Sequence, residues 1–349
     1  MRKSPVDVAA SLEAALIHNY SRNCESARTR HARLKFVPRR PSSRFDSMSR
    51  TTATPTAPET ANMPLLPSPL PSSAAYIDAF TRAGLPVLRH TVRAFEELRS
   101  ADPAPGAREI AAVVLADPLM TLRLLTHLEA NRRASQNHDI TTIERAVLML
   151  GVEPFFATFS DLPTVEDTLA AHPKALVVAL KLIARARRAA TLAREFATMR
   201  RDHEVQEITV ATLLREATEI VCAIHAPTLT LEAIARRQAE PARSAAEVQR
   251  EVFGISAAEL QNALIDAWRL PELLAGLLDS GHADNPRVRT ITLAARFARH
   301  QARGWTSPTL ADDLAELEAL LHQPRESLLQ RLGVPAELRA RLLPDAQPE

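Results

Sequence analysis

The chain has 349 residues, of which 46% are hydrophobic, 24% charged and 4% aromatic, with eight glycines and a formal net charge of +2. A globular composition rich in Ala, Leu and Arg and poor in Gly favours helix over sheet, so we expect an all-α protein. Cys24 and Cys222 are too few for a disulfide framework or a thiolate zinc site, which fits a cytoplasmic location. No run of about 20 apolar residues predicts a membrane helix.

The first part of the chain has the composition of a disordered segment. Residues 1–72 are rich in Arg, Ser, Thr and Pro and have little apolar surface to bury. Basic residues gather between Arg28 and Arg44, and only this stretch is a candidate for contact with nucleic acid. A disordered extension without a partner is the commoner alternative. Three methionines are alternative translation starts: Met1, Met48 and Met63.

After Ser73 the pattern predicts helices with explicit starts and stops. Pro86 suits the first position of a helix. Asp117-Pro118 reads as an N-cap followed by Pro at the first helical position. Thr141-x-x-Glu144 reads as a capping box, with Gly151 as the C-terminal cap of the same helix.

The second half of the chain continues in the same way. One long helix is predicted over residues 173–199 and another over about 206–223, stopped by Pro227. Two capping boxes, at residues 244–247 and 256–259, open helices on either side of Phe253-Gly254. No strand and no internal repeat is evident. Further helices are expected from Pro271, Arg287, Thr309 and Pro324.

Three blocks in this helical region carry a family resemblance. They are EIA with DPL at 109–111 and 117–119, ITTIERA with LG at 140–146 and 150–151, and EVFG with WRLP at 251–254 and 268–271, followed by His282. In this order the blocks resemble the HDOD family, the metal-poor signalling branch of the HD phosphohydrolase superfamily, from about Leu85 to Arg303. The resemblance implies a multi-helix HD-like domain at 73–304, between the disordered segment 1–72 and a C-terminal helical extension at 305–349.

Catalytically active relatives in the superfamily hold divalent metals with several His and Asp side chains. Here the position expected for the His-Asp pair reads Arg215-Glu216, and an earlier His would fall near Lys181. A third ligand position falls near Ala257, and of a late His-His pair only His282 remains. The resemblance therefore implies a pseudoenzyme with no catalytic residue, no metal and no cofactor.

Two interpretations of Arg215 stay open. In the first, Arg215 is a plain surface arginine. In the second, Arg215 or Lys181 supplies the positive charge once given by metal and pairs with Glu216 or Glu219. The residues that we expect to mark the degenerate pocket are Lys181, Arg215, Glu216, Glu219 and His282.

Other candidate metal ligands are weaker. His225, His282 and Asp284 lack the i, i+4 pairing of a helical metal motif, so structural or solvent-exposed roles are favoured. Asp202-His203 is an HD letter pair in a polar loop, and Cys222 on an apolar helix face fits the core better than a nucleophile role.

Two patterns bear on anion binding. Gly276 and Gly281 have the spacing of a phosphate loop, but the residues that follow exclude it. Lys181, Arg185 and Arg188 recur at helical spacing, either as an anion-binding stripe or, more commonly, as a solvated face.

We expect a non-catalytic bacterial signal-transduction module that acts by binding another protein, whose identity the sequence does not give. The rival is a metal-dependent HD-type phosphohydrolase with unrecognised ligands. A third alternative is a nucleic-acid-associated protein that uses the basic stretch. No membrane partner is expected.

Overall fold

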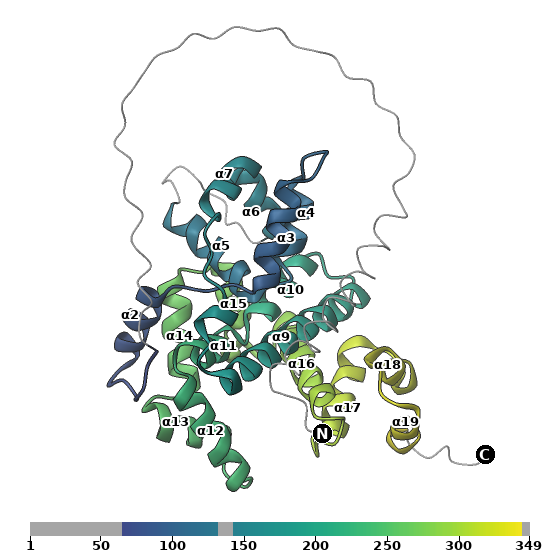
Figure 1. Ribbon diagram of the computed structural model, residues 1–349. Coiled ribbons are helices and arrows are strands. Elements are labelled where there is room, and N and C mark those ends of the chain that lie inside the picture. Colours follow the sequence, from purple (N-terminus) through teal and green to yellow (C-terminus); the bar gives the residue numbers. More distant parts are fainter. Residues whose placement is uncertain (1–64, 132–141, 344–349) are drawn as a thin grey trace, which may run out of the picture. The chain divides into compact units, whose positions relative to one another are not determined.

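The computed structural model describes residues 65–131 and 142–343 of the chain. Over these residues the protein is built of helices, as expected (Figure 1), and contains no strand, only one isolated bridge between Val87 and Thr164. No helix in this part of the chain is long and apolar enough to span a bilayer. The first half contains α2 (Ser73–Ala83), α3 (Arg89–Arg99), α4 (Ala107–Val114), α5 (Pro118–Ala130), α6 (Ile143–Leu150), α7 (Val152–Thr158), α8 (Val165–Thr168) and α9 (Pro173–Met199).

The second half continues with helices of similar length. They are α10 (Val205–Leu214), α11 (Ala217–His225), α12 (Pro227–Ala239), α13 (Ala245–Phe253), α14 (Ala257–Trp268), α15 (Glu272–Leu278), the 3₁₀ turn η1 (Ser280–His282), α16 (Pro286–Ala302), α17 (Leu310–Leu321), α18 (Arg325–Leu332) and α19 (Ala336–Leu342).

Helix α9 joins the two hydrophobic cores of the described region. Its first half packs into a core with α2, α11, α13 and α14, and its second half into a core with α3 to α7, α10 and α15 to α18. Alanines on its buried faces let α10, α11 and α16 approach closely. The middle of α9, where Arg185 and Arg188 lie, is therefore the place where the two cores meet. The predicted bounds of this helix are confirmed.

Asp117 fixes the start of α5 and also the start of α3. Its Oδ1 accepts the N–H groups of Leu119 (2.9 Å) and Met120 (3.3 Å), as expected of an N-cap followed by Pro118. Its Oδ2 accepts from Leu88 N–H and Thr91 Oγ1, both at 2.8 Å. The predicted helix start at Pro86 is wrong. Leu88 is held as the N-cap, so α3 begins at Arg89.

The capping signals of the later helices have mixed outcomes. Ser244 and Ser256 form the expected capping boxes of α13 and α14. Gly151 ends α6 with φ +86°, as expected. The predicted N-cap Thr141 lies outside the described residues, and α6 starts after Thr142, whose side chain makes no capping hydrogen bond.

The structure places the start of the folded region earlier than the sequence suggested. Residues 65–72, assigned above to the disordered segment, lie against the second core through their leucines. Leu66 N–H donates to the carbonyl of His225 (2.7 Å), and Leu70 N–H donates to Tyr76 Oη (3.1 Å). The three leucines of residues 65–72 are therefore packed against the folded region. The rest of the segment, including the basic stretch, lies outside the described residues.

The C-terminal helices share the first core. Leucines of α17 and α18 are buried in the same cluster as Phe297 of α16. A buried contact between His300 Nε2 and Asp313 Oδ2 (2.7 Å) joins α16 to α17. Residues beyond 304 thus add to the same core and do not form one of their own.

Candidate functional site

The chain breaks its helix at the position expected for the His-Asp pair. A single helix over residues 206–223 was predicted, but α10 ends at Leu214 and α11 begins at Ala217. Thr212 Oγ1 bonds back to the carbonyl of Ile208 (2.6 Å), a contact that bends helices. Glu216, with φ −98° and ψ 7°, leaves the helical path and precedes α11. The predicted continuous helix is therefore wrong at Arg215-Glu216.

The break turns the Glu216 carboxylate into the protein, where its side chain is 1% exposed. Arg185 of α9 shares its Nε–H between the two carboxylate oxygens, at 2.8 and 2.7 Å. The same guanidinium reaches Glu219 Oε2 through Nη2 (2.8 Å). From α16, Arg299 Nη2 lies 3.2 Å from Glu216 Oε1 and 3.8 Å from Glu219 Oε1. These four side chains form the arginine–glutamate cluster, which joins three segments of the fold.

Burial sets the electrostatics of this cluster. Loss of solvent raises the pKa of Glu216, and the charge of Arg185 opposes that rise. A buried carboxylate is stable only when it is paired and hydrogen-bonded, and both conditions are met here by arginine. The cluster therefore depends most on Arg185, whose contacts are the shortest.

The expectation that Arg215 or Lys181 would pair with Glu216 or Glu219 is wrong, because Arg185 and Arg299 occupy those carboxylates. The Arg215 side chain is half-buried and makes no hydrogen bond or ion pair with any described residue. Its pKa is lowered by burial and then by the nearby charge of Arg299.

The sequence gives a partial signal for the arginines that pair with Glu216 and Glu219. Arg185 belongs to the basic stripe that it forms with Lys181 and Arg188 in the sequence. Arg299 lies more than 80 residues from Glu216, and no local sequence pattern indicates that the two residues pair. Its role follows only from the packing of α16 on α9.

His282 is not part of the cluster. It is exposed and lies beside Asp279, with its Nδ1 3.0 Å from Asp279 Oδ2. Ala257, at another former ligand position, is the first residue of α14. The structure thus joins Glu216 and Glu219 in the cluster and places Lys181 with Glu219 in the lining of one cavity, while His282 stays outside both.

Other candidate ligands are occupied or remote. Asp202 lies beside Arg200 (3.6 Å) and Arg287 (3.2 Å), and His203 is exposed. His225 is buried against Phe80, and burial lowers its pKa to about 4. Within residues 65–131 and 142–343, no three His, Cys, Asp or Glu side chains are grouped so that they could hold a metal ion.

Cys222 fits the core role that the sequence favoured. It is 5% exposed on α11, and burial raises its pKa to about 12. Such a thiol stays protonated at neutral pH, so it is a poor nucleophile.

A cavity of about 890 Å³ adjoins the cluster. It lies between α9, α11, α12, α13 and the end of α16, and Arg185 and Glu219 belong to both the cluster and its wall. Three further cations line it: Lys181, Arg188 and Arg237.

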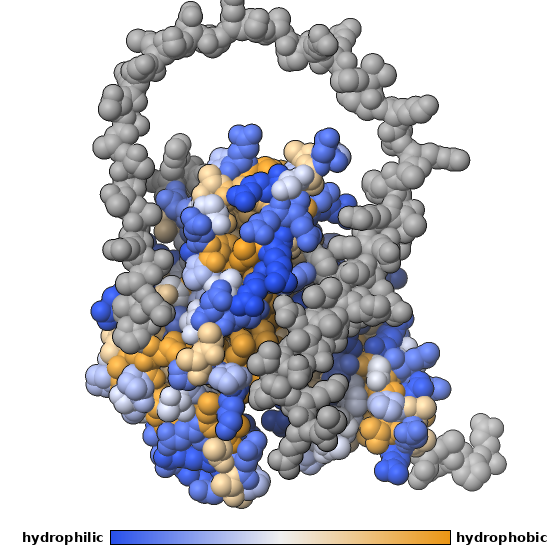
Figure 2. Space-filling model, in the orientation of Figure 1, coloured by the Kyte–Doolittle hydropathy of each residue, from blue (hydrophilic) through white to orange (hydrophobic). Residues whose placement is uncertain are grey.

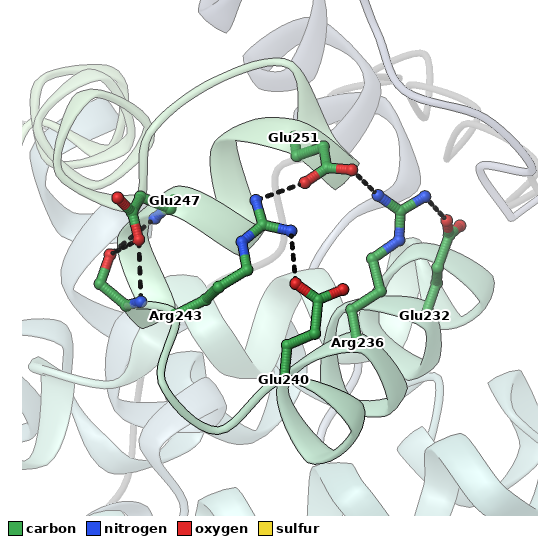
Figure 3. A network of polar contacts seen from close by, with 7 residues as sticks. Glu232, Arg236, Glu240, Arg243, Glu247 and Glu251 are labelled. Atoms are coloured by element: carbon green, nitrogen blue, oxygen red, sulfur yellow. Dashed lines mark hydrogen bonds and ion pairs between the residues drawn. The ribbon is translucent and has the colours of Figure 1, made fainter.

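One wall of this cavity is the α12–α13 hairpin, which an exposed charge network holds together (Figure 3). Glu251 of α13 bonds Arg236 of α12 and also Arg243 (2.6 Å) in the connecting loop. Arg236 also pairs with Glu232 (2.5 Å). The surface over α12 and α13 is mostly hydrophilic in Figure 2. Each exposed pair is weak alone, but together they fix α12 against α13.

Comparison with known proteins gives the family. The family model described as the HDOD domain matches residues 85–283, which is more than half of the chain. A solved virulence factor from Campylobacter jejuni is 16% identical, with a TM-score of 0.52, over 78% of this chain and 96% of that chain. This likeness shows the fold. No curated protein sequence matches significantly.

Two further solved structures are less similar by TM-score. The MmoQ response regulator from Methylococcus capsulatus is 21% identical, with a TM-score of 0.47, over 75% of this chain and 98% of its own. An HDOD domain protein from Geobacter sulfurreducens is 19% identical, with a TM-score of 0.40, over 77% of this chain and 96% of its own. The family match starts at Leu85, where the motif resemblance started, and ends at residue 283 instead of near Arg303. The chain belongs to the HDOD family.

Proposed function

We propose that this chain is a non-catalytic HDOD module that acts in signal transduction by binding another protein. The observation that carries the proposal is the pairing of Glu216 with two arginines at the position where an active relative would hold metal. Both carboxylate oxygens already accept from Arg185 Nε (2.8 and 2.7 Å), and Oε1 also lies 3.2 Å from Arg299. A metal ion would have to displace these partners.

The charge balance of this region also opposes a divalent cation. Three guanidinium groups, of Arg185, Arg215 and Arg299, lie near two carboxylates, of Glu216 and Glu219. The sum is positive, and like charges repel strongly where water is scarce. The rival phosphohydrolase needs several metal-binding donors to acidify water and neutralise phosphate, so this arrangement favours a non-catalytic role.

An exposed apolar pair supports partner binding. Leu148 (65% exposed) and Met149 (44% exposed) on α6 are the large hydrophobic side chains most open to solvent in the described part of the chain. Exposed apolar groups beside one another are typical of protein interaction surfaces. We propose this end of α6 as a contact for the partner.

Elemental analysis and a phosphodiesterase assay test the non-catalytic claim. The purified chain should hold well under one Fe, Mn, Zn or Mg per molecule. Added metals should give no more cleavage of bis(p-nitrophenyl) phosphate than they give with the Glu216→Gln variant. A tightly held metal, with cleavage lost in Glu216→Gln and on chelation, would establish the hydrolase instead.

A pull-down from the native cell, compared between variants, tests the partner surface. Leu148→Asp with Met149→Asp should lose a partner that the wild-type chain and an Arg108→Ala control both retain. Arg108 is exposed on α4 and is a suitable control because its side chain makes no hydrogen bond or ion pair with a described residue. Equal recovery with all three chains would refute this surface.

A further inference from the structure

The cavity beside the arginine–glutamate cluster carries positive charge that the protein does not balance. Lys181, Arg185 and Arg188 lie at i, i+4 and i+7 on α9, so they share one helix face, and all three line the cavity. Arg237 of α12 also lines the cavity. The basic stripe noted in the sequence thus opens onto a concave space, where the walls focus its field.

Three of these cations have no carboxylate partner among the described residues. Lys181 and Arg237 are exposed, and their side chains make no hydrogen bond or ion pair there. Arg188 donates to Gln301 Oε1 (2.6 Å) and to the carbonyl of Leu332 (3.3 Å), both of which are neutral. The acidic residue that lines the cavity, Glu219, is already bound by Arg185 at 2.8 Å.

The carboxylates that flank Arg237 in the α12–α13 hairpin have other partners. Glu232 and Glu251 both pair with Arg236, and Glu240 and Glu251 pair with Arg243 (Figure 3). The network therefore stiffens the wall and leaves the charge of Arg237 free to act on an occupant of the cavity.

Between these cations the cavity is mostly apolar. Its apolar lining comes from α9, α12 and α13: Val178, Leu182, Ile234, Val248 and Phe253. Thr230 also lines the cavity, and its Oγ1 is a buried hydroxyl with no hydrogen-bond partner in the described structure. A volume of about 890 Å³ with apolar walls and a few polar groups is typical of small-molecule sites, which measure roughly 300–1,000 Å³.

We propose that this cavity binds a small organic phosphate, in which a phosphate monoester is joined to an apolar body. Arginine fits phosphate oxygens well, and three of the four cations are arginines. The phosphate lies against the cations of α9 and Arg237, and the apolar body lies on the aliphatic lining. The body is either an alkyl chain or a nucleoside, and both present the same chemistry to this site. This inference does not rest on the proposed function.

Calorimetric titration of the full-length chain at low ionic strength tests the proposal. The probes are octyl phosphate below its micelle concentration, AMP, inorganic phosphate and octyl glucoside. At least one of the two organic phosphates should bind about tenfold more tightly than inorganic phosphate, and octyl glucoside should not bind. Binding of octyl phosphate alone identifies an alkyl body, and binding of AMP alone identifies a nucleoside; either result supports the proposal.

Matched charge variants show whether the cavity is the site. Lys181→Ala with Arg237→Ala should weaken binding at least about tenfold. The control, Lys174→Ala with Arg108→Ala, removes the same charge from exposed positions on α9 and α4 outside the cavity and should leave affinity unchanged. All four side chains are exposed, so both variants should keep the thermal midpoint of the wild-type chain.

The proposal is overturned if neither organic phosphate binds, if inorganic phosphate binds as tightly as both, or if the control weakens binding as much as the cavity variant. Free phosphate is measured in the same samples. Its release from a bound probe would contradict the non-catalytic function while leaving the cavity as the binding site, so the two claims fail separately.

Discussion

The Nε–H of Arg185 is shared between both carboxylate oxygens of Glu216, at 2.8 and 2.7 Å, across the break between α10 and α11. Glu216 is almost completely buried, and Arg185 is 20% exposed. This contact fixes the middle of α9 against the break. It also lies at the position where the sequence resemblance led us to expect the His-Asp pair of active relatives.

Arg215→Ala should change the free energy of unfolding by about 1 kcal/mol or less. Its guanidinium has no described partner and lies close to the like charge of Arg299, so its removal orphans no carboxylate. Denaturant melts of the variant and the wild-type chain provide the comparison. A loss of several kcal/mol would show that Arg215 has a buried partner after all.

The sequence predicts the helices well where local chemistry decides them. Pro173 at the start of α9 and the serine capping boxes of α13 and α14 are local signals, and those helices begin where expected. The starts of α3 and α11 are set by contacts from elsewhere. Asp117 holds Leu88 from a distance of 29 residues, and the buried pairing of Glu216 accompanies the break in the predicted helix.

The site is predicted from the sequence only in part. The family resemblance located Glu216, which stands at a motif position, and Glu219, which follows three residues later. It assigned the cation to Arg215 or Lys181, whereas Arg185 and Arg299 pair with both carboxylates in the structure. Arg299 and Arg237 come close to the site only through the packing of α16 and α12, which no local pattern encodes.

His225 should make stability fall as the pH is lowered. Burial lowers its folded-state pKa to about 4, against an ordinary value of 6.5 in the unfolded chain. Between these values the unfolded chain binds a proton that the folded chain does not. Stability due to the neutral ring is therefore present above pH 6.5 and is lost as the pH falls toward 4, by up to about 3 kcal/mol.

The difference between wild type and His225→Phe isolates this effect, because other groups titrate equally in both chains. The variant should show a flatter loss of stability between pH 6.5 and 4 in denaturant melts. Identical pH profiles for wild type and His225→Phe would contradict the expectation.

Removal of residues 1–64 should leave the thermal midpoint nearly unchanged, while removal of residues 1–72 should lower it. The longer deletion takes away Leu65, Leu66 and Leu70, which pack on the second core, and the bond from Leu66 N–H to His225. The shorter deletion removes a polar, Pro-rich segment with little apolar surface. Circular dichroism melts of the two truncated chains give the answer, and equal midpoints would restore the boundary at residue 73.

The most direct test of the account is a double-mutant cycle on Arg185 and Glu216, read as the free energy of unfolding in denaturant. Arg185→Ala should cost about 3–5 kcal/mol, because it leaves the Glu216 carboxylate buried with only the more distant Arg299. Glu216→Gln added to that variant should recover much of the loss, since the orphaned charge is gone, giving a coupling above about 2 kcal/mol. Additive effects below about 1 kcal/mol would contradict the account, because they would show that Arg185 does not hold the charge at the former metal position.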